Sequence, residues 1–190
     1  MNSITSYKLL VCSFFLLVFA TGCSKEYDTE TFENTSLVTV KLQGTQSVFS
    51  KVNIEVLEVQ FRVLEDENDP YAWVTLNTIN TGIHDLSSIT DNQVVTLVDF
   101  DEVPSEFIYS IKLVLGDQNS AKKNGVEYTL LLDAETENAS ANIVEKQLIS
   151  NSLYEFVMEL DLDESIEIST EGNAKLDPKM NTLLRRFELF

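Results

Sequence analysis

The chain has 190 residues, with 31 Asp and Glu against 13 Lys and Arg, and a formal net charge of −18 at pH 7. A surface this acidic repels phosphate backbones, so nucleic acid is not an expected partner. The chain has only two cysteines and one histidine, which leaves little material for a disulfide framework or for cysteine–histidine catalysis.

Residues 1–22 have the pattern of an export signal. Lys8 precedes an apolar run at residues 9–20 that is shorter than the roughly 20 residues a membrane-spanning helix needs. The following Ala20-Thr21-Gly22-Cys23 resembles the lipobox of bacterial lipoproteins. We therefore expect a lipoprotein signal peptide at residues 1–22 and lipidation of Cys23. The alternatives are an ordinary cleaved secretion signal and a retained helical anchor.

Residues 23–35 are polar and acidic, and they predict an acylated cysteine followed by a flexible tether. The order "CSKEYD" resembles the lysine-plus-acidic signal that sends some Gram-negative lipoproteins to the outside of the outer membrane. We expect a lipid-anchored outer-membrane protein exposed at the cell surface, with the periplasmic face as the alternative. Cys12 leaves with the signal peptide, so we expect no disulfide in the mature chain.

Residues 36–190 predict one domain made of short strands. Apolar and polar residues alternate with a period of two, as in "SLVTVKLQG", which is typical of half-buried strands. In "VNIEVLEVQFRVLE" the apolar residues change phase after Val56 and continue from Leu57. A slip of one residue turns every later side chain to the other face, so we expect a bulge or a strand crossing there.

Further strands follow in chain order. The turn "EDENDP" and the strand "YAWVTLN" predict a hairpin, and residues 79–92 predict a loop or a short helical turn. Strands are expected in "QVVTLVDF", "FIYSIKLVLG" and "KKNGVEYTLLL", where Asn124-Gly125 favours a type I′ turn. Residues 141–149 fit either a strand or a short helix. The segments "SLYEFVMELDLD", "SIEIST" and "TLLRRFELF" complete the expected strands.

This pattern indicates an all-β domain. Many short strands without a strand–helix rhythm predict an antiparallel β-sandwich of roughly seven to ten strands. The same pattern argues against a parallel α/β fold.

Seven blocks also resemble, in order, successive blocks of the domain of unknown function 4382 family, which occurs in bacterial lipoproteins. They are "VNIEVLEVQFRV", "WVTLN", "HDLSSIT", "IKLVLGDQN", "KNGVEYTL", "LDLDESI" and "GNAKLDPKM", and they span about residues 36–180. The chain departs from the family at "PSEFIY", where an Ala-Gly pair and an aromatic are usual, and at "DLDES", where a longer acidic stretch is usual. The resemblance implies an immunoglobulin-like or transthyretin-like sandwich, and it implies no ligand and no catalytic residues.

Acidic residues near strand ends are candidate calcium ligands, because Ca²⁺ prefers several converging carboxylate and carbonyl oxygens. The candidates are Asp99 and Asp101 in "DFDE" and Asp161, Asp163 and Glu164 in "DLDE". Neither cluster completes an EF-hand pattern. The alternative is that they are solvated acids that keep strand edges from pairing. A structural calcium ion is the one possible cofactor that the sequence suggests.

Tyr71 and Trp73 are candidate ligand-binding residues, because exposed aromatic rings form platforms for sugars; the alternative is that they belong to the core or to a strand face. His84 lies beside Asp85 and is expected to be a loop histidine. The sequence contains neither "GxSxG" nor "HExxH". We therefore expect no enzyme and assign no catalytic residue.

Three functions follow from these patterns. The leading hypothesis is a lipid-anchored, non-catalytic envelope protein that acts as a surface binding or adhesive module, with a glycan or a surface protein as its partner. The second is a structural subunit or assembly partner of a surface complex, joined through an edge strand. The third is a hydrolase that uses a pair of carboxylates.

Overall fold

The computed structural model describes residues 33–87, 94–132 and 139–189, so the expected signal peptide and Cys23 lie outside the described residues. The described part contains thirteen strands and one short helix. The strands are β1 (Thr35–Gly44), β2 (Lys51–Arg62), β3 (Trp73–Thr75), β4 (Gly82–Asp85), β5 (Val95–Pro104), β6 (Phe107–Leu115), β7 (Asn119–Lys123), β8 (Val126–Leu132), β9 (Ala139–Gln147), β10 (Ser152–Leu160), β11 (Ile166–Ile168), β12 (Ala174–Leu176) and β13 (Met180–Glu188), and the helix is α2 (Leu162–Ser165). None of the described segments is a candidate transmembrane helix.

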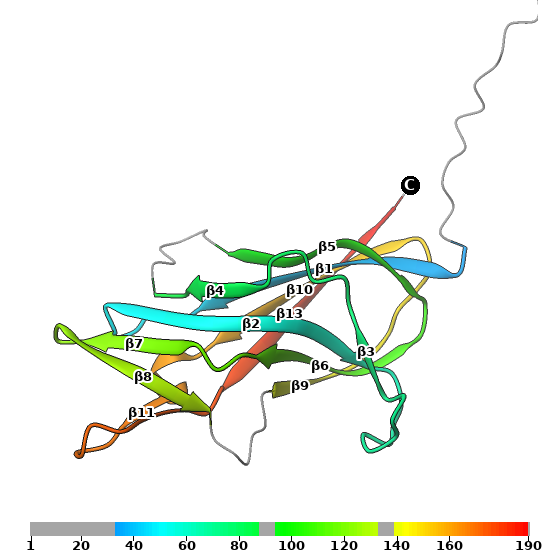
Figure 1. The fold of residues 1–190 in the computed structure, drawn as a ribbon. Coiled ribbons are helices and arrows are strands. Elements are labelled where there is room, and N and C mark those ends of the chain that lie inside the picture. The colour runs from blue at the N-terminus through cyan, green and yellow to red at the C-terminus, as the bar shows by residue number, and fades with distance from the viewer. Residues whose placement is uncertain (1–32, 88–93, 133–138, 190) are drawn as a thin grey trace, which may run out of the picture. The chain divides into compact units, whose positions relative to one another are not determined.

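The strands form two sheets, which Figure 1 shows as layers. Sheet A has the order β13-β10-β1-β5. Sheet B has the order β11-β12-β8-β7-β2-β6-β9, and β3 and β4 also pair with β2. Strand β2 is the centre of sheet B, because β6 and β7 follow one another along one of its edges while β3 and β4 follow one another along the other.

The predicted all-β sandwich is confirmed, with two refinements. Strand β1 pairs with β10 in parallel, and β8 pairs with β12 in parallel, so both sheets are mixed. The described strands also outnumber the predicted ones, because the short strands β4 and β12 were not predicted. Strand direction depends on how distant segments return to the sheet, and a local alternation pattern carries no information about it.

The core lies between the inner faces of the two sheets. Val38, Val40 and Leu42 of β1 are fully buried, and so are the alternating inward residues of β10. The rings of Phe61 in β2 and Phe156 in β10 lie 5.1 Å apart between centroids at a tilt of 57°, and they join sheet B to sheet A. Both rings are almost completely buried.

The predicted bulge in β2 is confirmed. Val56 pairs with Leu115 and Glu58 pairs with Val114, so Leu57 is an extra residue opposite β6. Leu57 is exposed, whereas Val56 and Val59 on either side are buried. The bulge therefore absorbs the phase change and keeps the apolar residues on both sides of it facing one core.

The predicted turn at Asn124-Gly125 is also confirmed. Both residues have positive φ, 52° and 83°, and they connect β7 to β8 with Lys123 opposite Val126. Residues 141–149, whose apolar positions fit either a strand or a short helix, contribute to strand β9. The expected loop at residues 79–92 is wrong in part, because Gly82–Asp85 form β4 against β2; the neighbouring residues 88–92 lie outside the described part.

The Phe61–Phe156 contact predicts a large effect on stability. Phe61→Ala removes a fully packed ring from the junction of the sheets, and we expect the free energy of unfolding to fall by about 3 to 5 kcal/mol. Chemical denaturation of a soluble form that starts at Phe32 measures this change. Leu131→Ala, at an exposed position on β8, is the matched control. A Phe61→Ala variant as stable as the Leu131→Ala variant contradicts the described core.

Candidate binding surfaces

The predicted aromatic pair lies at the start of β3. Tyr71, in the connection from β2, is 80% exposed, and its backbone N–H donates to Asp69 Oδ1 at 2.8 Å. Trp73 lies opposite Arg62 of β2 and is partly buried. The Lys112 ammonium lies 3.8 Å from the centroid of the Trp73 ring, so one face of the indole is occupied by a cation from β6.

Polar side chains of β2 and β3 surround this stack. Glu58 Oε2 accepts hydrogen bonds from Gln60 Nε2 at 2.8 Å and from Thr75 Oγ1 at 3.1 Å. Lys112 lies directly opposite Gln60, and its burial lowers the pKa of its ammonium below the usual value, which the nearby Glu58 carboxylate partly offsets. We call Trp73, Thr75, Glu58, Gln60 and Lys112 the sheet B face.

A second aromatic group extends the outer surface of sheet B. The Arg62 guanidinium lies 5.5 Å from the centroid of the Tyr109 ring, and the Tyr109 ring meets Phe107 edge-on at 4.7 Å. Sequence analysis missed Arg62 and Lys112 as parts of this surface. Their positions over the aromatic rings follow from the pairing of β2 with β3 and β6, and no local pattern in the sequence encodes that register.

The acidic cluster at residues 161–164 has structural hydrogen bonds. Asp161 is the N-cap of α2, and its Oδ1 accepts from the Glu164 N–H at 3.0 Å. Asp163 Oδ1 accepts from Ser47 Oγ at 2.6 Å and from the Val48 N–H at 3.1 Å. These carboxylates therefore satisfy backbone donors at a helix start and in a loop.

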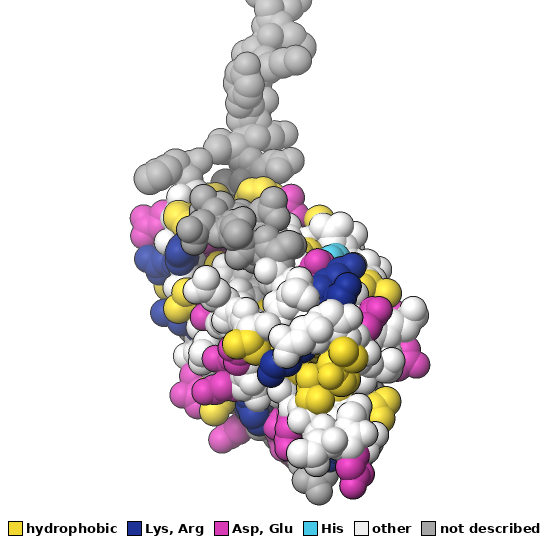
Figure 2. Space-filling model, turned by 90° about the vertical axis from the view of Figure 1, so that its left-hand side faces the viewer, with side chains coloured by type: hydrophobic (Ala, Val, Ile, Leu, Met, Phe, Trp, Pro, Cys, Tyr) yellow, Lys and Arg dark blue, Asp and Glu magenta, His cyan; other side chains and the backbone are white. Residues whose placement is uncertain are grey.

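The other acidic cluster lies on β5. Asp101 Oδ2 accepts from the Asn77 N–H at 2.9 Å, Glu102 Oε1 accepts from Thr35 Oγ1 at 2.6 Å, and Asp99 is exposed. Among the described residues, no three His, Cys, Asp or Glu side chains gather as a metal site. Figure 2 shows acidic, basic and hydrophobic side chains intermixed on one face of the molecule. Calcium binding stays a prediction from the sequence.

His84 lies in β4 opposite Ile54, and its Nε2 donates to the Asn80 carbonyl at 3.1 Å. The neighbouring Asp85 accepts hydrogen bonds from Ser87 through Oδ1, including one from the hydroxyl at 2.6 Å. The histidine therefore lies in a strand instead of the expected loop, and its recorded bond is to a backbone carbonyl.

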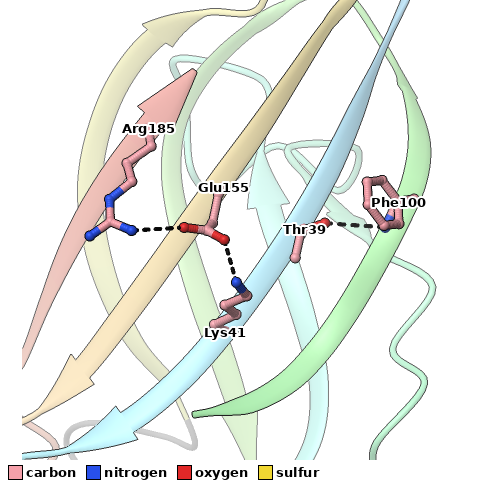
Figure 3. A network of polar contacts seen from close by, with 5 residues as sticks. All are labelled: Thr39, Lys41, Phe100, Glu155 and Arg185. Atoms are coloured by element: carbon pink, nitrogen blue, oxygen red, sulfur yellow. Dashed lines mark hydrogen bonds and ion pairs between the residues drawn. The ribbon is translucent and has the colours of Figure 1, made fainter. Parts of the chain in front are cut away.

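An ion-pair network crosses the outer face of sheet A (Figure 3). Glu155 of β10 accepts a hydrogen bond from Lys41 of β1 through Oε2 and one from Arg185 of β13 through Oε1, the latter at 3.2 Å. The bond from Lys41 is the main cause that holds the pKa of Glu155 below its usual value, and partial burial opposes it. Beside the network, Thr39 Oγ1 accepts from the Phe100 N–H at 3.3 Å.

These features define an all-β sandwich domain with mixed sheets, an aromatic and polar surface on one sheet, and an ion-pair network on the other. The chain belongs to the family described as "Domain of unknown function (DUF4382)", whose model matches residues 35–178. Comparisons with curated proteins and with solved structures give no match. Strand β13 lies after the matched residues.

The Glu155 network predicts a pH-dependent contribution to stability. The lowered pKa means that the charged carboxylate stabilises the fold above the pKa of the unfolded chain, and this stabilisation is lost as the pH falls through the lower pKa of the folded state. Glu155→Gln is expected to lower the free energy of unfolding by about 1 kcal/mol at pH 7. The difference from the wild type should shrink below about pH 4.

Denaturation at a series of pH values checks this expectation. Glu127→Gln, at an exposed position on β8, is the control for removing one negative charge. An effect of Glu155→Gln that stays constant down to about pH 2, or that equals the effect of the control, contradicts the role of the network.

Proposed function

We propose that the protein is a lipid-anchored, non-catalytic binding module at the outer surface of a Gram-negative cell envelope, and that its ligand is a glycan. The leader at residues 1–22 and Cys23 in the lipobox-like segment support the anchor. The observation that carries the binding role is the sheet B face, where the Trp73 indole lies among amide, hydroxyl and carboxylate groups.

The chemistry of this face fits a sugar ring. An indole offers a flat apolar surface for the C–H groups of a pyranose, and neighbouring polar side chains fix the orientation of its hydroxyls. Glu58, Gln60 and Thr75 supply both acceptors and donors within one hydrogen-bonded group. Tyr71 adds an exposed ring on the connection that leads into β3.

Lys112 sets the energetic cost of binding on the indole. Its ammonium covers the ring at 3.8 Å, so a sugar that stacks on the same ring face has to displace it. A cation–π contact at an exposed site is worth about 0.5 to 1 kcal/mol, which a few good hydrogen bonds to the ligand offset. The displaced ammonium stays close enough to donate to a sugar oxygen.

A glycan array probed with a soluble form that starts at Phe32 tests the ligand class. Trp73→Ala is expected to weaken binding by about thirtyfold or more, because truncating a central aromatic anchor commonly costs about 2 kcal/mol or more. Phe100→Ala, which removes an exposed ring on sheet A, is the control and should leave binding unchanged. Absence of any array signal, or equal losses in both variants, contradicts a glycan-binding role for the sheet B face.

The anchor has a separate test. Intact mass measurement of the protein from its native cells should give a chain that begins at Cys23 and carries fatty acyl groups, and Cys23→Ser should release the domain from the membrane fraction. A first cysteine without fatty acid, in a protein recovered from the soluble cytosolic fraction, contradicts the proposed anchor and the surface location together.

A second candidate function is a structural subunit of a surface assembly. One observation favours it: the outer edge of β13 has no strand partner within the described residues. An exposed strand edge is a template for an added strand, which is a common mode of recognition between proteins.

A further inference from the structure

Strand β13 ends sheet A with a long and regular edge. It pairs with β10 from Ser152↔Glu188 to Leu160↔Met180 without any shift in register. Within the described part of the chain, no strand pairs with its other edge. The unpaired N–H and C=O groups of this edge therefore repeat without a bulge over all nine residues of the strand.

The opposite edge of sheet A is covered. The Ile79 N–H donates to the Leu97 carbonyl of β5 at 2.8 Å, and Asn80 Nδ2 donates to the Thr96 carbonyl at 2.6 Å. Phe100 interrupts the strand further along with a φ of 49°. These features are typical of an edge protected against pairing with another chain.

The neighbouring edge of sheet B is interrupted. Strand β9 pairs with β6 through a register shift in which two residues, Val144 and Glu145, lie opposite one. Glu145 has a φ of 45°, so the strand bends at this point. Among the long edge strands of the described residues, β13 is thus the one with a regular, unpaired backbone, and β9 of sheet B lies close to it without pairing.

Strand β13 exposes large apolar side chains, which an edge strand that stays in contact with water does not require. Leu183 is 55% exposed and Phe187 is 47% exposed on the outer face, which β13 shares with Glu155 and Val157 of β10. Leu184 faces inward, where it packs at the border of the core and is only partly buried. Pairing of another strand with this edge would cover both Leu183 and Leu184.

We propose that the occupant of this edge is a second copy of the chain, with β13 antiparallel to β13 of the second copy and Leu184 opposite Leu184 at a twofold axis. In this register all nine residues of the strand are paired. The outer face then opposes Leu183 to Arg185 and Asn181 to Phe187, so Leu183 and its counterpart become diagonal neighbours. The inner face opposes Thr182 to Arg186.

The alternative registers are poorer. Centring the pair on Arg185 or on Arg186 opposes two arginines directly, which is destabilising. Centring it on Leu183 avoids that clash but pairs only seven of the nine residues, 180–186. The sequence of the strand thus fits one full-length self-pairing, which joins the two copies of sheet A into one continuous sheet.

Charge sets the conditions for this dimer. Each copy has a formal net charge of −18, so the two copies repel one another at low ionic strength. The paired strand itself has two arginines and one glutamate, so the repulsion comes from the rest of the domain and is screened by salt. The dimer should therefore strengthen as salt is added. It lies on sheet A and does not depend on glycan binding by the sheet B face.

Sedimentation of the full chain in detergent, over a range of protein and salt concentrations, tests the proposal. The wild type should be dimeric at micromolar concentration, and Leu183→Lys and Phe187→Lys should each raise the dissociation constant by about tenfold or more. Leu131→Lys is the matched control: Leu131 is 65% exposed, but both edges of its strand, β8, are paired. This control should stay dimeric, and thermal melts verify that each variant is folded.

A photo-crosslinking residue in place of Asn181 checks the register. In a mixture of light and heavy-isotope chains, it should crosslink to a peptide of the other copy that contains Phe187. The proposal is overturned if the wild type stays monomeric throughout the micromolar range, or if the folded β13 variants dimerise as the wild type does. It is also overturned if Leu131→Lys weakens the dimer as much as the β13 variants do, or if the crosslinks between copies join residue 181 to a segment other than β13. None of these outcomes alters the expected glycan binding.

Discussion

The domain depends on the burial of alternating side chains along β2. The only cysteines of the chain are Cys12 and Cys23, both before the first strand, so no disulfide supports the sandwich. Strand β2 pairs with four other strands of sheet B and turns its apolar residues toward the inner face of sheet A. The contact of Phe61 with Phe156 serves both the pairing within sheet B and the packing of the two sheets, because it connects the centre of sheet B to the centre of sheet A.

The bulge at Leu57 lets one strand meet two requirements. The residues before it pair with β4 and β7, and Val56 also pairs with the end of β6; the residues after it pair with β3 and with the rest of β6. An extra residue locally increases the twist of a strand, so the two halves of β2 can follow different neighbours while both keep their apolar residues in the core. The same register places Trp73 and Lys112 on either side of β2, within reach of one another.

Local signals in the sequence were enough to predict the all-β fold class, the bulge in β2 and the Asn124-Gly125 turn, because each of these depends on a few adjacent residues. The parallel pairs β1–β10 and β8–β12 were not predictable in this way, because they join segments far apart in the chain. Strand β4 was missed because it has only four residues and begins at a glycine. The candidate surface was found only in part: Trp73 stands out in the sequence, whereas Lys112 belongs to it only through the register of the sheet.

The importance of β2 can be measured by hydrogen exchange of backbone amides, since amides in the most stable part of a fold exchange only through global unfolding. The amides of β2 at Ile54, Val59 and Phe61 should be among the slowest in the domain and should exchange with the free energy of global unfolding. Amides of the edge strand β13 should exchange faster, through local opening. Fast exchange in β2 while β13 stays protected would contradict this account of how the domain is held together.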